Sequence, residues 1–330
     1  MIPVGIAANR PGVAGGVHVR FPEIFARDGQ TFSFEFFPPK TEEATDQLFA
    51  HIARLEALKP TFVTVTYGAG GSTRQRTGDV IRRIQRQHPA LDPIAHLTCV
   101  LQSRGEMEEI LTQYARSGVS NILALGGDPP RGASLGDRGP TDFHHAIDLV
   151  RFIRAFNARG IHPHRDGFGI GVAGFPEGHP ATPNRLMEMD YLKAKVDAGA
   201  DYICTQLFFD NRDFYDFCER CELAGIHVPV LAGIMPYTSV AGMKRMAELA
   251  LGARYPAALL RAVARCGNDA EAVRRVGILW ASEQCRDLLD QGVKGIHFYT
   301  MNRAEATEEI YTNLGVTDSV QLRATRRMGC

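Results

Sequence analysis

The sequence has no long apolar run, no net charge and few cysteines, and each shortage excludes a class of protein. No stretch approaches the ~18–20 consecutive apolar residues that a membrane-spanning helix needs. The first five residues, MIPVG, lack the basic region and apolar core of a secretory signal. We therefore expect a cytoplasmic protein with no membrane partner.

The charges balance, with 37 Lys and Arg against 37 Asp and Glu. A nucleic-acid-binding domain usually carries a basic excess or a basic stripe, and the composition offers neither. The partners expected are small molecules and not nucleic acid, and the chain is expected to form a homo-oligomer.

The seven cysteines are an odd number scattered through 330 residues, which is unlike a disulfide framework. Cys218 and Cys221 form a CxxC pair, but the segment 213–225 has the pattern of a helix and no second pair completes a zinc site. We expect reduced thiols, helix packing at this pair, and no bound metal.

Hydrophobic residues make up 45% of the chain, enough for a sizeable core, and eight strand-like runs alternate with longer helical segments. A βα unit repeated eight times, with strands apolar on both faces, predicts a single (β/α)₈ TIM barrel in the α/β class. A doubly wound sheet shares the alternation, but the count of eight and the lack of a linker favour the barrel. The strand-like runs are 31–37, 62–67, 93–99, 121–126, 168–174, 202–209, 228–234 and 295–300, and the clearest helical segments are 41–59, 73–87, 106–118 and 185–199.

The pattern divides the chain into two parts. Residues 1–30 are expected to form a short N-terminal extension, irregular or partly helical, and residues 31–330 the barrel that carries catalysis. The long interval 238–292 predicts two or three extra helices before the last strand.

In a (β/α)₈ barrel the functional groups lie at the C-terminal ends of the strands. Glu35 is a lone carboxylate in the apolar run 32–37, and burial favours the protonated form that a general acid needs. The alternative for Glu35 is a structural ion pair. Asp128 follows two glycines and precedes two prolines, so it either grips an amino-pyrimidine edge or simply forms a turn.

Residues 169–174, GIGVAG, match the GxGxxG dinucleotide fingerprint, but the glycines lie inside a strand and prolines delay the next helix. We interpret the match as false and the small residues as room for a flat ligand. Lys195, on the next helix, is a candidate phosphate contact, whereas Lys193, His162 and His164 are interpreted as surface residues.

Seven motifs, in order along the barrel, resemble the short, FAD-dependent bacterial methylenetetrahydrofolate reductases. The resemblance leaves only the first 30 residues and the last dozen uncovered. The motifs are FSFEFFPPK (32–40), FVTVTYGAGGSTR (62–74), HLTC (96–99), NILALGGDPP (121–130), GVAGFPEGHP (171–180), LKAKVDAGADYICTQLFFD (192–210) and HFYTMNRAE (297–305).

The resemblance implies a barrel that binds FAD noncovalently and works by a ping-pong scheme, with NAD(P)H as co-substrate and a folate as substrate. It implies that hydride passes through flavin N5, that Glu35 helps to protonate the folate, and that Asp128 and Gln206 hold the pterin. Phe175 would cover the flavin ring. The implied FAD contacts are Thr66, His96, Gly127, Asp128, Ala173, His179 and Lys195, together with His145, Glu188 and Tyr191.

Two positions depart from the family pattern. Gly126 stands where a basic residue commonly precedes the Gly-Asp pair, and Met246 stands where some relatives stack a phenylalanine on the nicotinamide substrate. Both departures bear on cofactor and nicotinamide affinity. The competing hypothesis is a flavin-free, pterin-binding barrel of the methyltransferase or pteroate-synthase type, and a barrel that only binds its ligand is a third.

Overall fold

The computed structural model describes residues 19–67, 74–128, 139–182, 184–250 and 252–325. Eight parallel strands pair in chain order, and β1 also pairs with β8, which closes the sheet into a barrel. Closure confirms the predicted (β/α)₈ fold and excludes the doubly wound sheet. The strands are β1 (Thr31–Phe36), β2 (Phe62–Val65), β3 (Pro93–Thr98), β4 (Asn121–Leu125), β5 (Gly169–Gly174), β6 (Tyr202–Thr205), β7 (Val230–Ile234) and β8 (Gly295–Tyr299).

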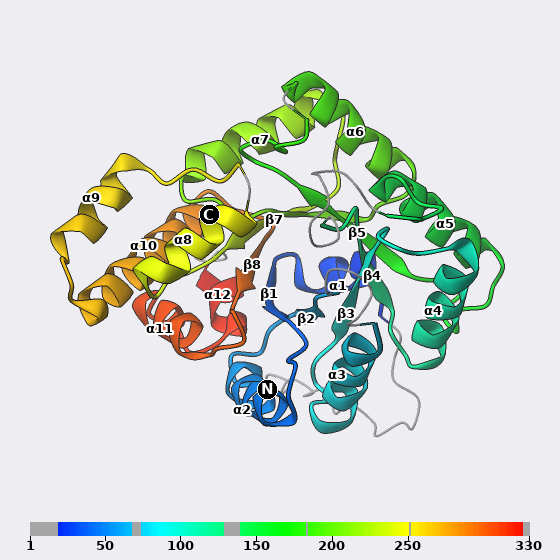
Figure 1. Cartoon of the computed structure of the whole chain (residues 1–330), viewed down its shortest axis with the longest axis horizontal. Coiled ribbons are helices and arrows are strands. Elements are labelled where there is room, and N and C mark those ends of the chain that lie inside the picture. Colours follow the sequence, from blue (N-terminus) through cyan, green and yellow to red (C-terminus); the bar gives the residue numbers. More distant parts are fainter. Residues whose placement is uncertain (1–18, 68–73, 129–138, 183, 251, 326–330) are drawn as a thin grey trace, which may run out of the picture.

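Helices surround the barrel, and three of them gather on one side between β7 and β8, as Figure 1 shows. These three confirm the extra helices expected in 238–292. Within the described part of the chain, no helix is both long enough and apolar enough to cross a membrane. The helices are α1 (Phe21–Asp28), α2 (Glu42–Glu56), α3 (Arg74–Gln87), α4 (Arg104–Arg116), α5 (Ala146–Ala158), α6 (Arg185–Asp197), α7 (Asn211–Leu223), α8 (Val240–Leu249), α9 (Ala257–Arg265), α10 (Ala270–Asp290), α11 (Glu305–Asn313) and α12 (Ser319–Thr325).

The sixth strand is shorter than expected, because β6 ends at Thr205 and not at residue 209. The backbone carbonyls of Phe208 and Phe209 accept hydrogen bonds from Gln284 (3.1 Å) and Trp280 (3.0 Å) of α10. Side chains of a helix therefore bind the carbonyls that a neighbouring strand would otherwise bind, and the prediction for 206–209 is wrong.

Side chains alternate along β1, and the alternation separates Glu35 from its phenylalanine neighbours. Phe34 contacts Tyr311 of α11, with ring centroids 6.3 Å apart, so it lies outside the barrel. The Ser33 hydroxyl bonds to His297 of the neighbouring strand β8, and Glu35 lies near His96 of β3. The side chains of Ser33 and Glu35 therefore both point into the barrel. Phe32, Phe34 and Phe36 are thus buried on the outer face of β1 and do not surround the carboxylate, whereas Phe37, beyond the strand, is exposed.

Helix α1 closes the N-terminal end of the barrel. The ring of Phe21 stacks on Tyr202 with centroids 3.9 Å apart, and its backbone N–H donates to Asn121 Oδ1 at 2.6 Å. Asn121 in turn donates from Nδ2 to the carbonyl of Val19 at 2.8 Å. The described end of the predicted extension is therefore built into the barrel core.

The glycines of β5 make room for protein side chains. A Cβ on Gly171 would lie 2.2 Å from Tyr202 Cζ, and one on Gly169 would lie 2.2 Å from Asn121 Oδ1. Packing within the barrel therefore requires these two glycines, and a flat ligand against the end of β5 stays a prediction. The GxGxxG match does lie inside the strand, as expected, and its glycines serve packing.

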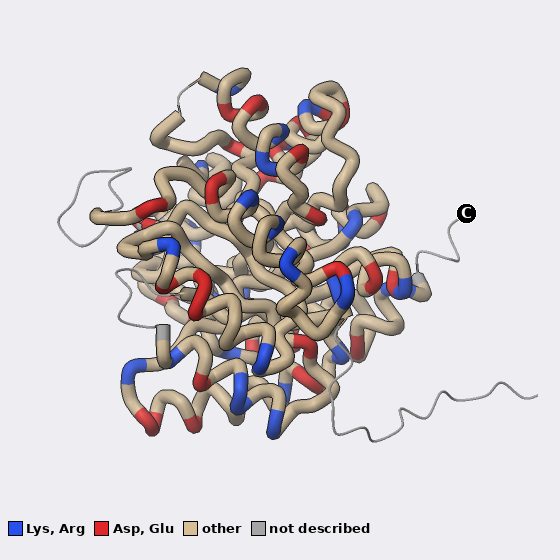
Figure 2. Tube along the Cα trace, turned by 90° about the vertical axis from the view of Figure 1, so that its right-hand side faces the viewer, with Lys and Arg blue, Asp and Glu red and all other residues tan. Residues whose placement is uncertain are grey.

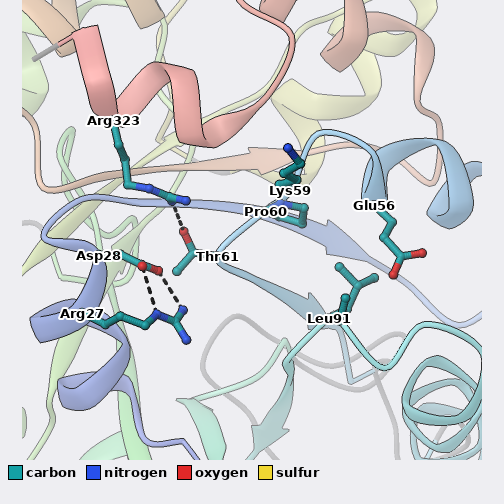
Figure 3. A pocket seen from close by; sticks show the side chains of 9 residues that line it. Arg27, Asp28, Glu56, Lys59, Pro60, Thr61, Leu91 and Arg323 are labelled. Atoms are coloured by element: carbon teal, nitrogen blue, oxygen red, sulfur yellow. Dashed lines mark hydrogen bonds and ion pairs between the residues drawn. The ribbon is translucent and has the colours of Figure 1, made fainter. Parts of the chain in front are cut away.

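The end of the barrel opposite to Glu35 also has a cavity, of about 310 Å³, at the N-terminal ends of the first strands (Figure 3). Arg27 donates to both carboxylate oxygens of Asp28, at 3.0 and 2.8 Å, and Lys59 pairs with Asp318 at 2.6 Å. These charged groups already satisfy one another, so we assign this cavity no ligand. Figure 2 shows acidic and basic residues equally interspersed over the face it presents.

The contact between Gly171 and Tyr202 gives the first prediction. Gly171→Ala should lower the free energy of unfolding by ~1–3 kcal/mol, because the added methyl overpacks the barrel interior. Denaturation in guanidinium chloride measures this. Gly105→Ala is the control: a Cβ at Gly105 meets nothing within 4 Å, so stability should stay level or rise. Equal stability of both variants would contradict the packing argument.

Candidate active site

The C-terminal half of the barrel interior holds a group of polar side chains that the sequence spreads over 260 residues. Glu35 of β1 lies between two imidazoles: its Oε2 is 3.6 Å from His96 Nε2 and 3.5 Å from His297 Nε2. Both imidazole nitrogens are buried, and neither has a hydrogen-bond partner among the described residues. Glu35 keeps one-fifth of its side-chain surface exposed, so a ligand above the barrel can reach it.

The two histidines differ in their second contacts. Nδ1 of His297 lies 2.8 Å from the Ser33 hydroxyl, and the His297 ring meets Tyr299 edge to face at 5.1 Å. Burial lowers the pKa of His96 to about 4, against a smaller opposing effect of Glu35. At neutral pH, His96 is therefore an uncharged imidazole and does not form a full ion pair with Glu35.

Two further groups beside Glu35 stay protonated. Burial raises the pKa of the Cys204 thiol and of the Tyr299 hydroxyl well above their ordinary values. Tyr299 also donates to the carbonyl of Thr205 at 2.7 Å, which fixes its ring. Near neutral pH the thiol and the phenol beside Glu35 therefore keep their protons and do not act as bases.

His297 is not among the site residues expected from the sequence. A signal was present: His297 and Tyr299 alternate along β8 and pair with Ser33 and Glu35 of β1, so all four face inward. Recognising this signal requires the register between β1 and β8, the pair that closes the barrel, and a single sequence does not give that register.

The end of β4 carries Gly127 and Asp128. Gly127 has a φ of +83°, and a Cβ there would lie 2.6 Å from a methyl carbon of Val100, so both conformation and space require glycine. Gly126 is half-buried, whereas Asp128 is exposed at the rim. Pro129 and Pro130, which follow Asp128 in the sequence, lie outside the described residues.

The loop after β5 brings four more of the expected residues together. Lys195 of α6 reaches back and donates to the Ala173 carbonyl at 2.8 Å, and burial lowers its pKa to about 8. Glu188 accepts from the backbone N–H of His179 at 3.0 Å, and burial raises its pKa. Its second oxygen, Oε2, is buried and has no hydrogen-bond partner in the part of the chain that the structure describes.

Phe175 packs edge to face on the ring of His179, with centroids 4.6 Å apart. Gln206 lies next to this loop: its backbone N–H donates to the Gly174 carbonyl, and its side-chain Oε1 accepts from Leu207 N–H at 2.9 Å. Thr66 is half-buried at the end of β2. These three residues therefore lie at the same end of the barrel as Glu35.

Two further expected site residues are exposed, and one is enclosed. His145 and Tyr191 are exposed, His145 as the N-cap of α5 and Tyr191 on α6. Met246 is only 7% exposed and packs in an apolar cluster under α8 with Leu207 and Met235. Stacking of Met246 on a nicotinamide would require this cluster to rearrange.

The structure also shows whether His162, Lys193 and Cys221 are buried or lie at the surface. His162, expected at the surface, is buried, because Nε2 bonds to the Val119 carbonyl and the ring packs on Phe168. Lys193 is surface-located as expected and pairs with Asp197. Cys221 of α7 is buried in the hydrophobic core, and burial raises the pKa of its thiol to about 12, in keeping with a packing role.

Comparison with known proteins gives a consistent result. The family model "Methylenetetrahydrofolate reductase" matches residues 20–315. The chain is 39% identical over 307 residues to the "Probable methylenetetrahydrofolate reductase (NADH)" of Oryza sativa subsp. japonica, covering 90% of this chain and 50% of that protein. It is 38% identical over 284 residues to the "5,10-methylenetetrahydrofolate reductase" of Salmonella typhimurium, covering 86% and 90%. The chain thus spans about half the length of the plant relatives and most of the bacterial one.

A solved structure supports the fold alone. It is titled "Uncharacterized protein from Clostridium thermocellum binds two copies of 5-methyl-5,6,7,8-tetrahydrofolic acid", and it matches with a TM-score of 0.58 at 14% identity. The match covers 93% of this chain and 98% of that one.

The lowered pKa of His96 predicts a loss of stability in acid. The unfolded chain binds this proton near pH 6.5 and the folded chain only near pH 4, so between these values the unfolded state holds more protons. The His96 contribution to the free energy of unfolding should therefore fall by about 2 kcal/mol from pH 7 to pH 5.

Urea denaturation of the apoprotein at both pH values measures this loss, and His96→Gln should lose about 2 kcal/mol less than the parent protein. His227 is exposed, so His227→Gln is the matched control and should behave like the parent. Identical acid sensitivity of the parent and His96→Gln would show that His96 titrates normally.

Proposed function

Because the chain belongs to the methylenetetrahydrofolate reductase family, we propose that it is an FAD-dependent oxidoreductase that interconverts 5,10-methylenetetrahydrofolate and 5-methyltetrahydrofolate. NAD(P)H is its proposed electron partner. The observation that carries the proposal is Glu35, a partly exposed carboxyl group inside the barrel with two imidazole nitrogens at 3.6 and 3.5 Å from one of its oxygens.

Glu35 is the proposed general acid. Opening of the five-membered ring of methylenetetrahydrofolate needs a proton on the nitrogen that leaves the methylene carbon. The carboxyl group of Glu35 lies below the open end of the barrel, shielded from bulk water except for its exposed edge. It gives up its proton there and becomes a carboxylate, which the neighbouring imidazoles can stabilise by donating N–H groups.

The rim residues fit FAD. Glu188 Oε2 is a buried acceptor that no described residue donates to, which suits a ribose hydroxyl. Lys195 uses one ammonium donor on the Ala173 carbonyl, so it retains donors for a phosphate. Gly127 presents backbone without a side chain at the end of β4. FAD bound here would supply hydride transfer between the nicotinamide and the folate methylene carbon.

Asp128 and Gln206 are the proposed pterin contacts. The carboxylate of Asp128 is exposed at the rim and accepts hydrogen bonds, as an amino-pyrimidine edge requires. The side-chain oxygen of Gln206 is already used by Leu207 N–H, so its amide nitrogen is the group that remains to donate to a ligand.

The first test of the proposal is the colour of the purified protein and its two half-reactions. A yellow protein, or one that becomes yellow with added FAD, should be reduced by NADH or NADPH and then reoxidised by methylenetetrahydrofolate. A colourless protein that cannot be reconstituted with FAD would instead favour a flavin-free, folate-dependent transferase.

Glu35→Gln should separate the half-reactions. Flavin reduction needs no acid at the folate and should keep its rate, whereas reoxidation by folate should slow by ~10²–10⁴-fold. Stopped-flow absorbance of the flavin measures both steps. An equal loss in both half-reactions would show that Glu35 has only a structural role.

Asp128→Asn keeps the shape of the side chain and removes its charge. Folate binding should weaken, and the flavin midpoint potential should rise, because a nearby anion disfavours electron uptake. Spectroelectrochemistry of the reconstituted protein gives the potential. An unchanged potential would place Asp128 away from the flavin ring.

A further inference from the structure

Glu35 Oε2 is approached by two imidazole nitrogens, and only one of these rings is held by a hydrogen bond. His297 bonds through Nδ1 to Ser33 at 2.8 Å, whereas no hydrogen bond joins His96 to another described residue, and both rings are at least 95% buried. The position of His297 relative to Glu35 is therefore fixed by a second residue on the same strand as Glu35.

The Ser33 contact selects between the two tautomers of His297. If Ser33 donates its hydroxyl proton to Nδ1, the ring proton is on Nε2 and points at the Glu35 carboxylate. If Nδ1 donates to Ser33, the lone pair of Nε2 faces the carboxylate, which is unfavourable when Glu35 is ionised. An ionised Glu35 thus favours the first arrangement, a chain of donors from Ser33 through His297 to Glu35.

The distance of 3.5 Å from His297 Nε2 to Glu35 Oε2 is slightly longer than a hydrogen bond. Catalytic hydrogen bonds are often long in the free enzyme and shorten when the substrate is bound. The N–H of His297 is therefore placed to form a full bond at the moment when Glu35 becomes a carboxylate.

The other groups that face Glu35 are not oriented toward it as His297 is, because no hydrogen bond to a described residue selects the tautomer of His96 and the Tyr299 hydroxyl donates to the Thr205 carbonyl. They are His96 from β3, Cys204 from β6 and Tyr299 from β8. Burial keeps His96 uncharged and keeps the thiol and the phenol protonated near neutral pH.

We propose that His297, oriented by Ser33, is a positioning residue that stabilises ionised Glu35 through Nε2–H and so sets the pH range in which Glu35 can deliver its proton. This inference rests on the proposed function of Glu35 as general acid. Ser33 and His297 act through Glu35 and not on the folate directly.

The tautomer can be measured in the apoprotein without any reaction. ¹⁵N spectra of the protein labelled at histidine distinguish Nδ1–H from Nε2–H, and the signal missing in His297→Asn identifies His297. We expect Nε2–H at pH 8 in the parent protein and a mixture of tautomers in Ser33→Ala. An Nδ1–H tautomer in the parent would overturn the proposal.

The kinetic test uses two variants that each keep one end of the imidazole. In His297→Asn the amide lies near the former Nδ1 and cannot reach Glu35, whereas in His297→Gln it lies near the former Nε2 and can donate. The rate of flavin reoxidation by folate should fall as pH rises through the range in which Glu35 loses its proton. Loss of the His297 donor favours protonated Glu35, so this fall should move to higher pH by about one unit in His297→Asn and by much less in His297→Gln.

The controls separate the two levels of the argument. His227→Asn makes the same chemical change at an exposed histidine before β7 and should leave the profile unchanged. Flavin reduction by the nicotinamide should keep its rate in every variant. If methylenetetrahydrofolate does not reoxidise the reduced flavin of the parent protein, the proposed function fails. If the parent is active and His297→Asn keeps the parental pH profile, or if His297→Gln moves as far as His297→Asn, the inference about His297 fails.

Discussion

A carboxylate placed inside a closed barrel is the feature on which the arrangement of this site depends. Burying a charge costs free energy unless polar groups surround it. The alternation of β1 directs Glu35 inward, and β3 and β8 contribute His96 and His297 at 3.6 and 3.5 Å. Ser33, two residues before Glu35 on the same face of β1, orients His297. The polar residues of the upper barrel interior are thus the environment that one carboxyl group requires.

The rest of the interior is divided by size. Tyr202 fills the space beside Gly171, and Tyr299 fills the space beside Gly233, where a Cβ would lie 2.8 Å from its ring. Below Tyr202 the interior is apolar and closed by Phe21 of α1. The two tyrosines and their glycines therefore divide the interior into a packed lower end and a polar upper end.

Ion pairs join the loop after β5 to the segment between α8 and α9 at the C-terminal end of the barrel. Glu177, in the loop after β5, accepts from both the backbone and the guanidinium of Arg254, at 2.9 and 3.0 Å, and Arg254 also binds Asp213 of α7 at 2.5 Å. These contacts hold Arg254, which lies between α8 and α9, against the loop after β5. Gly252 and Ala253, next to Arg254, thereby line a small pocket together with Gln206, and Ala253 also packs against the apolar cluster that contains Met246.

The sequence by itself determined the barrel, its extra helices and the strand ends that carry Glu35, Asp128 and Gln206, because periods of two and of 3.6 residues are local properties of the chain. It also carried the family motifs. Only the tertiary structure decided what lies opposite each residue. The inward direction of Glu35, its two imidazoles, the rings that fill the glycine positions of β5 and the burial of His162 all depend on register and closure between distant segments. A local pattern does not contain these contacts, since each joins residues separated by tens to hundreds of positions.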